Sequence, residues 1–192
     1  MKKYAAVFPG QGSQSVGMFK DFMDDPIVAK TYAEASEALG YDMKDVTLNG
    51  PESELNRTEV TQPAILTASI AAFRALTEKC GAPCAVAGHS LGEYSALVAA
   101  GVLNFADALR LVRLRGQAMQ EAVPVGKGAM AAVLGIDDEV IVEVCKQVSV
   151  EGDEVWAANF NTPGQVVISG SKDACDRACA EFTARGARRV VP

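Results

Sequence analysis

The 192-residue sequence predicts an α/β protein with two domains, residues 1–123 and 124–192. Two observations carry this prediction. A break rich in Pro and Gly follows a long amphipathic helix, and its sequence is Val123-Pro124-Val125-Gly126-Lys127-Gly128. Beyond the break, strand and helix patterns alternate in the order β-α-β-β-α-β, whereas the first domain combines strong helices with few strands.

The first domain should begin with a buried strand and continue mainly as helices. Thr61 is the expected N-cap of its second helix, and Asn104 is the expected N-cap of its last one. Because the strands are too few to complete an α/β sheet, this domain should be incomplete. The predicted elements are a strand over 4–8, helices over 27–39 and 62–79, a strand over 84–87, and helices over 91–100 and 104–123.

The second domain is predicted to be a ferredoxin-like split unit. A turn over 161–164 should join its two middle strands, because Asn, Pro and Gly are favoured in turns. Its predicted elements are strands over 129–134, 155–160, 165–170 and 188–191, with helices over 138–148 and 172–185.

A serine between a strand and a helix is the strongest candidate for a catalytic group. Ser90 lies in the sequence Gly88-His89-Ser90-Leu91-Gly92, which follows a short apolar run and opens a helix. In this context a G-x-S-x-G motif forms a nucleophile elbow, which lifts the serine hydroxyl clear of the sheet so that it can attack acyl groups. The alternative is a Gly-Ser turn that merely starts a helix.

A second glycine-rich turn follows the first strand and has the sequence Pro9-Gly10-Gln11-Gly12-Ser13-Gln14. Backbone N–H groups that converge in such a turn can hold a ligand oxygen. An oxyanion hole for acyl transfer needs one N–H from the residue after the nucleophile, Leu91, and one from a separate loop, for which Gln11 is the candidate. A phosphate-binding loop is disfavoured because its further glycine and lysine signatures are missing, and a plain strand-to-helix turn is the remaining alternative.

Arg115 is expected within the apolar face of the helix over 104–123. That face consists of residues at helical spacing, Ala108, Leu111, Val112, Met119 and Ala122. A buried guanidinium requires an anionic partner, because an unpaired buried charge is strongly unfavourable. The partner is either an internal carboxylate or a substrate carboxylate held through two parallel hydrogen bonds. The second alternative, beside an acyl-transferring serine, implies an acyl group that carries its own carboxylate.

Five motifs resemble, in order, those of the malonyl-CoA:acyl-carrier-protein transacylase family of fatty-acid synthesis. The resemblance runs over essentially the whole chain. The motifs are Pro9-Gly10-Gln11-Gly12-Ser13-Gln14, Thr61-Gln62-Pro63-Ala64, Gly88-His89-Ser90-Leu91-Gly92-Glu93-Tyr94-Ser95, Arg113-Leu114-Arg115-Gly116 and Asn159-Phe160-Asn161-Thr162-Pro163-Gly164-Gln165.

The resemblance implies a hydrolase-like parallel-sheet domain into which the ferredoxin-like domain is inserted, with the active site in the cleft between them. It also implies that Ser90 is the acyl-accepting nucleophile, that Gln11 and Leu91 form the oxyanion hole, and that Arg115 binds the malonyl carboxylate. The further residues assigned to substrate binding are Gln62, His89, Asn159, Asn161 and Arg189.

The general base of this family is a histidine in a motif downstream of residue 192, whereas the sole histidine of the chain is His89. As the neighbour of Ser90, His89 should project to the opposite side, where it packs beneath the turn or orients the loop instead of taking the Ser90 proton. We therefore expect the chain to be the N-terminal part of a larger enzyme. A missing C-terminal segment or a second polypeptide would supply the base.

Composition and charge restrict the partners and the compartment. The net charge of −6 disfavours nucleic acid, and no stretch is long and apolar enough for a signal-peptide core or a membrane span. The five cysteines form no C-x-x-C pair, which fits a reducing cytoplasm and argues against structural zinc. We expect no cofactor and no metal, since CoA enters as part of a thioester substrate. The basic cluster of Arg185, Arg188 and Arg189 is either a docking site for acidic carrier protein or CoA phosphates, or a solvated edge.

The expected function is ping-pong transfer of a malonyl group from malonyl-CoA to the phosphopantetheine thiol of acyl carrier protein, through malonyl-Ser90. Two alternatives remain. A serine hydrolase of the patatin-like lipase type would use the same serine but would not need Arg115. A binding or scaffold fragment would keep the fold and be inert without the catalytic histidine.

Overall fold

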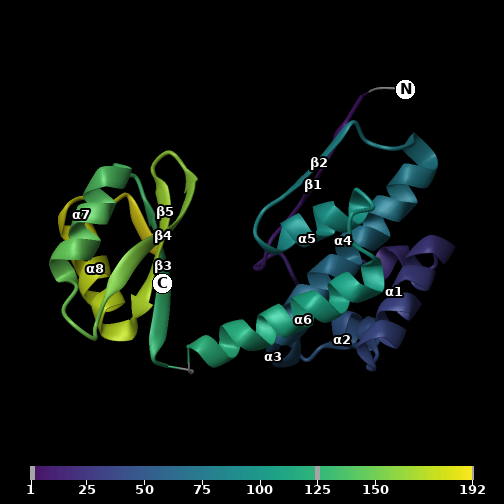
Figure 1. The fold of residues 1–192 in the computed structure, drawn as a ribbon, viewed down its shortest axis with the longest axis horizontal. Coiled ribbons are helices and arrows are strands. Elements are labelled where there is room, and N and C mark those ends of the chain that lie inside the picture. Colours follow the sequence, from purple (N-terminus) through teal and green to yellow (C-terminus); the bar gives the residue numbers. More distant parts are fainter. Residues whose placement is uncertain (1–2, 124–125, 192) are drawn as a thin grey trace. The chain divides into compact units, whose positions relative to one another are not determined.

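The computed structural model describes residues 3–123 and 126–191, and the chain separates into two compact units, Met1–Glu121 and Ala122–Pro192 (Figure 1). Pro124 and Val125, in the break predicted between the domains, lie outside the described residues. Each unit has its own cluster of buried apolar side chains, so each is described by itself.

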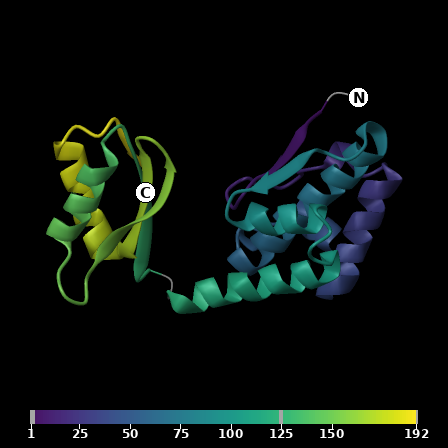
Figure 2. The ribbon, with the colours of Figure 1, turned by 45° about the horizontal axis from the view of Figure 1, so that its top comes forward.

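The first unit is mostly helical and contains one small parallel sheet. Its elements are β1 (Ala5–Phe8), η1 (Lys20–Phe22), α1 (Pro26–Leu39), α2 (Met43–Asn49), α3 (Glu52–Leu55), α4 (Thr58–Cys80), β2 (Ala85–Gly88), α5 (Leu91–Ala99) and α6 (Phe105–Ala122). The strands β1 and β2 pair in parallel from Ala5 opposite Ala85 to Phe8 opposite Gly88, and they lie side by side next to α5 (Figure 2). The scarcity of strands that the sequence predicted for this domain is confirmed.

The central helix of the first unit is α4. Every residue from 60 to 71 on this helix is buried, and α1, α3 and α5 pack against it. The predicted N-cap at Thr61 is wrong, since α4 begins about a turn earlier. The Thr61 hydroxyl instead donates a hydrogen bond of 2.6 Å to the carbonyl oxygen of Leu55, which joins α4 to the short helix α3.

The helix α6 begins as predicted, because the Asn104 side chain accepts hydrogen bonds from the N–H groups of Ala106 and Asp107. Its apolar face differs from the prediction: Leu111 and Met119 are 42% and 47% exposed, and Ala122 is exposed as well. The buried stripe is rotated round the helix and shares Ala108 and Val112 with the predicted face. The buried residues of α6 are Phe105, Ala108, Leu109, Val112 and Gly116.

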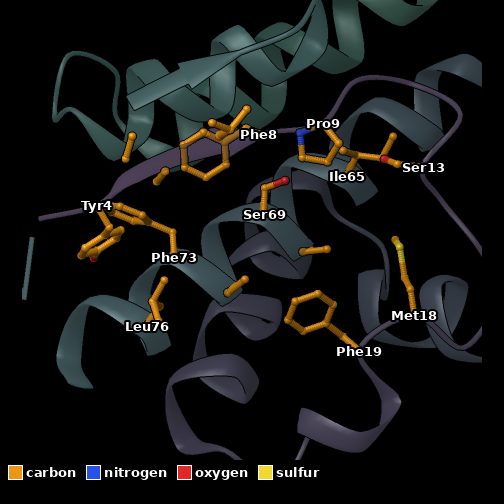
Figure 3. A pocket seen from close by; sticks show the side chains of 15 residues that line it. Tyr4, Phe8, Pro9, Ser13, Met18, Phe19, Ile65, Ser69, Phe73 and Leu76 are labelled. Carbon is orange, nitrogen blue, oxygen red and sulfur yellow. The ribbon is translucent and has the colours of Figure 1, made fainter. Parts of the chain in front are cut away.

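An apolar groove of about 440 Å³ lies between β1 and α4 (Figure 3). Phe8 and Phe73 both line it, and their rings meet edge to face with centroids 5.9 Å apart. Val7, in the middle of β1, is 75% exposed. Within the described residues β1 pairs only with β2, so the other edge of β1 has no neighbouring strand there.

The second unit has the β-α-β-β-α-β order that the sequence predicted. Its elements are β3 (Gly128–Leu134), α7 (Asp138–Val148), β4 (Val155–Thr162), β5 (Gln165–Ser171), α8 (Lys172–Ala184) and β6 (Arg189–Val191). The sheet is antiparallel with the strand order β4-β5-β3-β6. Both helices pack against one face of it, which buries Ile141, Ile168 and Phe182.

The hairpin between β4 and β5 is tighter than predicted. Thr162 pairs with Gln165, so Asn161 and Thr162 continue the strand and only Pro163 and Gly164 form the turn. Gly164 has φ 75°, which suits the residue after Pro in a two-residue turn of this kind. None of the helices in the described ranges is both long and apolar enough to cross a membrane.

Candidate active site

Ser90 occupies the sharp turn between β2 and α5. Its backbone has φ 52° and ψ −111°, outside the regions that L-residues favour, and its side chain is exposed. Such a conformation costs on the order of 1–3 kcal/mol and persists only where the surroundings enforce it. The strained serine between strand and helix that the G-x-S-x-G motif predicts is therefore present.

Two glycines make this turn possible. A Cβ added to Gly88 would lie 1.9 Å from the carbonyl oxygen of Gly92, and a Cβ on Gly92 would lie 2.2 Å from the carbonyl oxygen of Phe8. No larger residue fits at either position without movement of the backbone. The turn thus packs directly on the carboxyl end of β1.

The loop that follows β1 lies against the same turn. A Cβ on Gly10 would approach the His89 carbonyl oxygen to 2.8 Å and His89 Nδ1 to 3.1 Å, so the imidazole lies beside this loop. Gln14 braces the loop from within: its Oε1 accepts a hydrogen bond from the Gly12 N–H, and its Nε2 donates one to Asn56 Oδ1, both at 2.8 Å. The loops after β1 and β2 are neighbours because parallel strands end at the same edge of a sheet.

Gln11 lies in the loop after β1, and Leu91 directly follows Ser90 in the turn after β2. Neither of their backbone N–H groups donates a hydrogen bond to any group in the described ranges, and Leu91 is the first residue of α5, whose N–H has no partner within the helix. Two available donors at adjoining loops, one of them directly after the serine, are what an oxyanion requires.

Arg115 reaches the serine from α6 and is partly buried rather than fully buried. Its Nη2 donates to Ser90 Oγ over 3.3 Å, and its Nη1 donates to Gln62 Oε1 over 2.8 Å. The guanidinium also lies 5.7 Å from the centroid of the Tyr94 ring. Across the described chain, no Asp or Glu forms an ion pair with Arg115, so the alternative of an internal salt bridge is wrong.

The structure thus brings together Ser90, Gln62 and Arg115, which are distant in sequence. The loop after β1, which contains Gln11, lies beside His89 in the Ser90 turn. Asn159, Asn161 and Arg189 belong to the second unit, and all three are exposed.

Sequence reasoning missed two members of the Ser90 cluster, Tyr94 and Met119. Met119 Sδ accepts a hydrogen bond of 3.3 Å from Gln62 Nε2. Tyr94 lies four residues after Ser90, the N-cap of α5, and Met119 lies four residues after Arg115 on α6, so this spacing could have indicated them. In the part of the chain that the structure describes, no group of three or more His, Cys, Asp or Glu side chains could hold a metal ion.

A family model described as "Acyl transferase domain" matches residues 6–191. The chain therefore belongs to the acyl transferase domain family. It is 57% identical over 194 residues to the malonyl CoA-acyl carrier protein transacylase of Escherichia coli (strain K12), with 100% of the chain and 62% of that protein covered. It is 47% identical over 193 residues to the protein of the same name from Bacillus subtilis, with 100% and 61% covered.

Solved structures agree with this assignment. The chain matches the malonyl CoA-acyl carrier protein transacylase of Coxiella burnetii with a TM-score of 0.94 and 46% identity, covering 99% of the chain and 60% of that structure. It matches a malonyl-transacylase solved in complex with a type II PKS acyl-carrier protein with a TM-score of 0.94 and 54% identity, covering 100% and 62%. The chain spans about 62% of the length of the first curated relatives that it matches.

Proposed function

We propose that this chain carries the acyl-accepting part of an [acyl-carrier-protein] S-malonyltransferase of fatty-acid biosynthesis. The observation that carries the proposal is the hydrogen bond from Arg115 Nη2 to Ser90 Oγ, 3.3 Å long. It places a cation within reach of any acyl group bound to the serine. A guanidinium at this distance favours a malonyl group, whose free carboxylate lies two bonds from the reacting carbonyl carbon. It offers no such interaction to a neutral acyl group.

In the proposed reaction, Ser90 sits on a nucleophile elbow and its Oγ attacks the thioester carbonyl carbon of malonyl-CoA. The N–H groups of Gln11 and Leu91 hold the oxyanion, the C–S bond breaks, and CoA leaves as a thiol once it is protonated. The phosphopantetheine thiol of acyl carrier protein then attacks malonyl-Ser90 and releases the serine. Arg115 holds the malonyl carboxylate during both steps. Gln62 and His89 support the bound substrate in the first unit, and Asn159, Asn161 and Arg189 in the ferredoxin-like unit contact the substrate or the carrier protein.

The general base is a histidine from outside these 192 residues, supplied by polypeptide that corresponds to the remaining length of the curated relatives. His89 lies beside the Gly10 loop, which suits orientation of that loop better than removal of the Ser90 proton. A serine without a positioned base reacts slowly, because loss of a triad member typically costs factors of thousands. The proposed compartment is the cytoplasm.

Labelled malonyl-CoA tests this proposal against its two alternatives. The chain is incubated with the thioester, alone and together with the histidine-bearing remainder of a curated relative, and its mass and the free acid are followed. Stable malonylation of Ser90, with turnover restored by the added polypeptide, supports the transferase. Release of free malonate without carrier protein supports a serine hydrolase, and absence of label in both mixtures supports an inert module.

A further inference from the structure

Only neutral groups hold Arg115 within the described residues. Gln62 Oε1 and Ser90 Oγ accept its hydrogen bonds, and the Tyr94 ring lies beside the guanidinium. Five other arginines form ion pairs with Asp or Glu, namely Arg57, Arg74, Arg110, Arg177 and Arg185. The arginine next to the candidate nucleophile therefore differs from these in keeping an uncompensated positive charge.

A carboxylate on the neighbouring helix, that of Glu59, binds other partners instead of Arg115. A Cβ on Gly116, the residue after Arg115, would lie 2.7 Å from Glu59 Cα, so α6 and the start of α4 are in contact at this point. The Glu59 carboxylate nevertheless accepts a hydrogen bond of 3.0 Å from Gln117 and forms an ion pair with Arg57. Its charge is thus engaged by Arg57 and Gln117 and not by Arg115.

The Gln62 side chain is completely buried and its amide has one orientation. Nε2 donates to Met119 Sδ over 3.3 Å, and Oε1 accepts from Arg115 Nη1 over 2.8 Å. A reversed amide would set an NH2 group against the guanidinium, where both are donors and neither can accept. The donor-only guanidinium therefore sets the orientation in which Oε1 faces Arg115, and the contact of Nε2 with Met119 Sδ agrees with it.

We infer that Gln62 is a specificity-determining residue, a neutral acceptor that fixes the Arg115 guanidinium and leaves its positive charge for an anionic acyl group. A carboxylate at position 62 would hold the guanidinium equally well but would neutralise it. An apolar side chain at this position would leave the positive charge of Arg115 intact but would no longer hold its guanidinium in one orientation. The inference rests on the proposed function, because it takes the carboxylate of the acyl group as the ligand of Arg115.

The test compares Gln62→Glu, Gln62→Met and a matched control, Gln147→Glu. Gln147 also accepts a hydrogen bond from an arginine, Arg185, but lies in the second unit outside the Ser90 cluster. Two readouts are needed. The first is the ratio of the rates at which malonyl-CoA and acetyl-CoA acylate Ser90, followed by intact mass. The second is the affinity for free malonate, measured from the Nε resonance of Arg115 without any acyl transfer.

Gln62→Glu should lower the malonyl-to-acetyl ratio by at least about tenfold, as expected for loss of a charge-assisted hydrogen bond, and should weaken malonate binding to a similar extent. Gln62→Met should slow acylation by both thioesters and leave their ratio nearly unchanged, and Gln147→Glu should alter neither readout. An unchanged ratio in Gln62→Glu, or an equal fall in Gln62→Met, would overturn the inference.

Circular dichroism checks that each variant is folded. If Gln62→Glu does not fold, the ratio measured for Gln62→Met decides the question. If the unaltered chain reacts with neither thioester, alone or together with the histidine-bearing polypeptide, the proposed function fails. Malonate binding by the folded variants then decides whether Gln62 preserves the charge of Arg115.

Discussion

The amide of His89 donates a hydrogen bond of 3.2 Å to the carbonyl oxygen of Phe8, so the residue before Ser90 is tied to the last residue of β1. This bond extends the parallel pairing of β1 and β2 by one residue into the turn. The strained backbone of Ser90 is thereby anchored on its N-terminal side to a strand and on its C-terminal side to α5. The position of the serine consequently depends on β1, although more than 80 residues separate them in sequence.

Replacement of Arg115 by alanine should remove the preference for a carboxylate-bearing acyl group. Loss of a hydrogen bond to a charged group should raise the barrier for malonyl transfer to Ser90 by about 1.5–3 kcal/mol while sparing acetyl transfer. The measurement is the acylation rate of Ser90 with each thioester. Arg110→Ala is the control, because Arg110 is exposed on the same helix and pairs with Asp107. Equal losses for both acyl groups would contradict the assignment.

Gly92→Ala should destabilise the first unit, because the new Cβ would lie 2.2 Å from the carbonyl oxygen of Phe8, which is backbone and cannot move aside cheaply. We expect a loss of about 2–3 kcal/mol in the free energy of unfolding. Gly40→Ala is the control: Gly40 has φ 76° and open space around it, so only its backbone conformation is penalised, by about 1 kcal/mol. Urea unfolding followed by circular dichroism gives both values, and similar losses would refute the steric argument.

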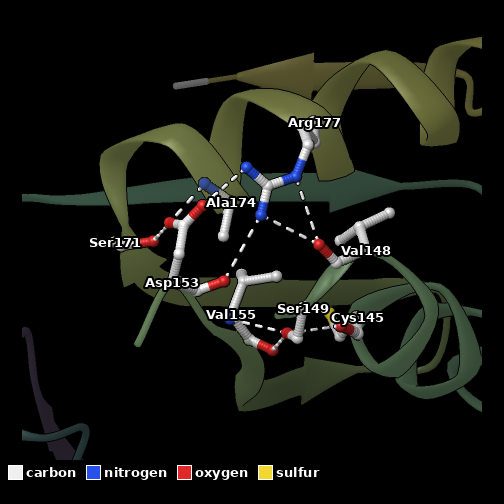
Figure 4. Close-up of polar contacts among 8 residues, drawn as sticks. All are labelled: Cys145, Val148, Ser149, Asp153, Val155, Ser171, Ala174 and Arg177. Carbon is white, nitrogen blue, oxygen red and sulfur yellow. Dashed lines mark hydrogen bonds and ion pairs between the residues drawn. The ribbon is translucent and has the colours of Figure 1, made fainter. Parts of the chain in front are cut away.

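Acid should weaken the second unit through Asp153. Hydrogen bonds from Ser171 and Arg177 hold the pKa of this carboxyl below its ordinary value of 3.8 (Figure 4). Because the pKa is lowered by folding, this stabilisation is present above pH 3.8 and is lost as the pH falls through the lowered value. The sole tryptophan, Trp156, lies in the same unit, and its fluorescence reports unfolding. The Asp153→Asn variant should lose this part of the pH dependence, and an unchanged profile would show that other groups cause it.

Charge reversal of Arg189 should slow docking of an acidic carrier protein. Arg189 is exposed on β6 and, unlike Arg185, forms no ion pair within the described residues. Arg189→Glu is expected to lower the association rate by roughly tenfold at low ionic strength, with little effect in high salt. Lys172→Glu, which alters another exposed cation of the same unit, is the control. If Arg189→Glu leaves the rates with both carrier protein and CoA unchanged, Arg189 does not belong to the proposed site.

The long elements were predictable because their periodic patterns extend over many residues. The helices α1 and α6 and the whole order of the second unit follow from such patterns and from caps such as Asn104. The short helices α2 and α3 were missed, since helices of this length depend on tertiary contacts. In α2 the first N–H, of Met43, donates to Ser36 Oγ on α1, a partner that local sequence does not reveal.

The parts of the candidate site that lie close together in sequence were predictable, whereas contacts that depend on packing between helices were not. Ser90 and the flanking glycines are adjacent in sequence, so their motif identifies the turn. The contact between Gln62 and Arg115 joins residues that are 53 positions apart. The burial of Arg115 was overestimated because the predicted apolar stripe of α6 included the exposed residues Leu111 and Met119 on either side of it. Arg115 lies at the rim of the buried stripe, where it can meet both solvent and Ser90.

The pairing of β1 with β2 alone leaves a signature for hydrogen–deuterium exchange. The carbonyl oxygens of Tyr4 and Phe8 accept bonds from the β2 side, so in a parallel ladder alternate peptide groups of β1 face that way and those of Ala5 and Val7 face the opposite edge. Deuterium should therefore enter Ala5 and Val7 faster than Ala6 and Phe8. If a further polypeptide pairs with this edge, the alternation should disappear, and protection of Ala5 and Val7 would then report that β1, the strand paired with the one that leads into Ser90, has neighbours on both edges.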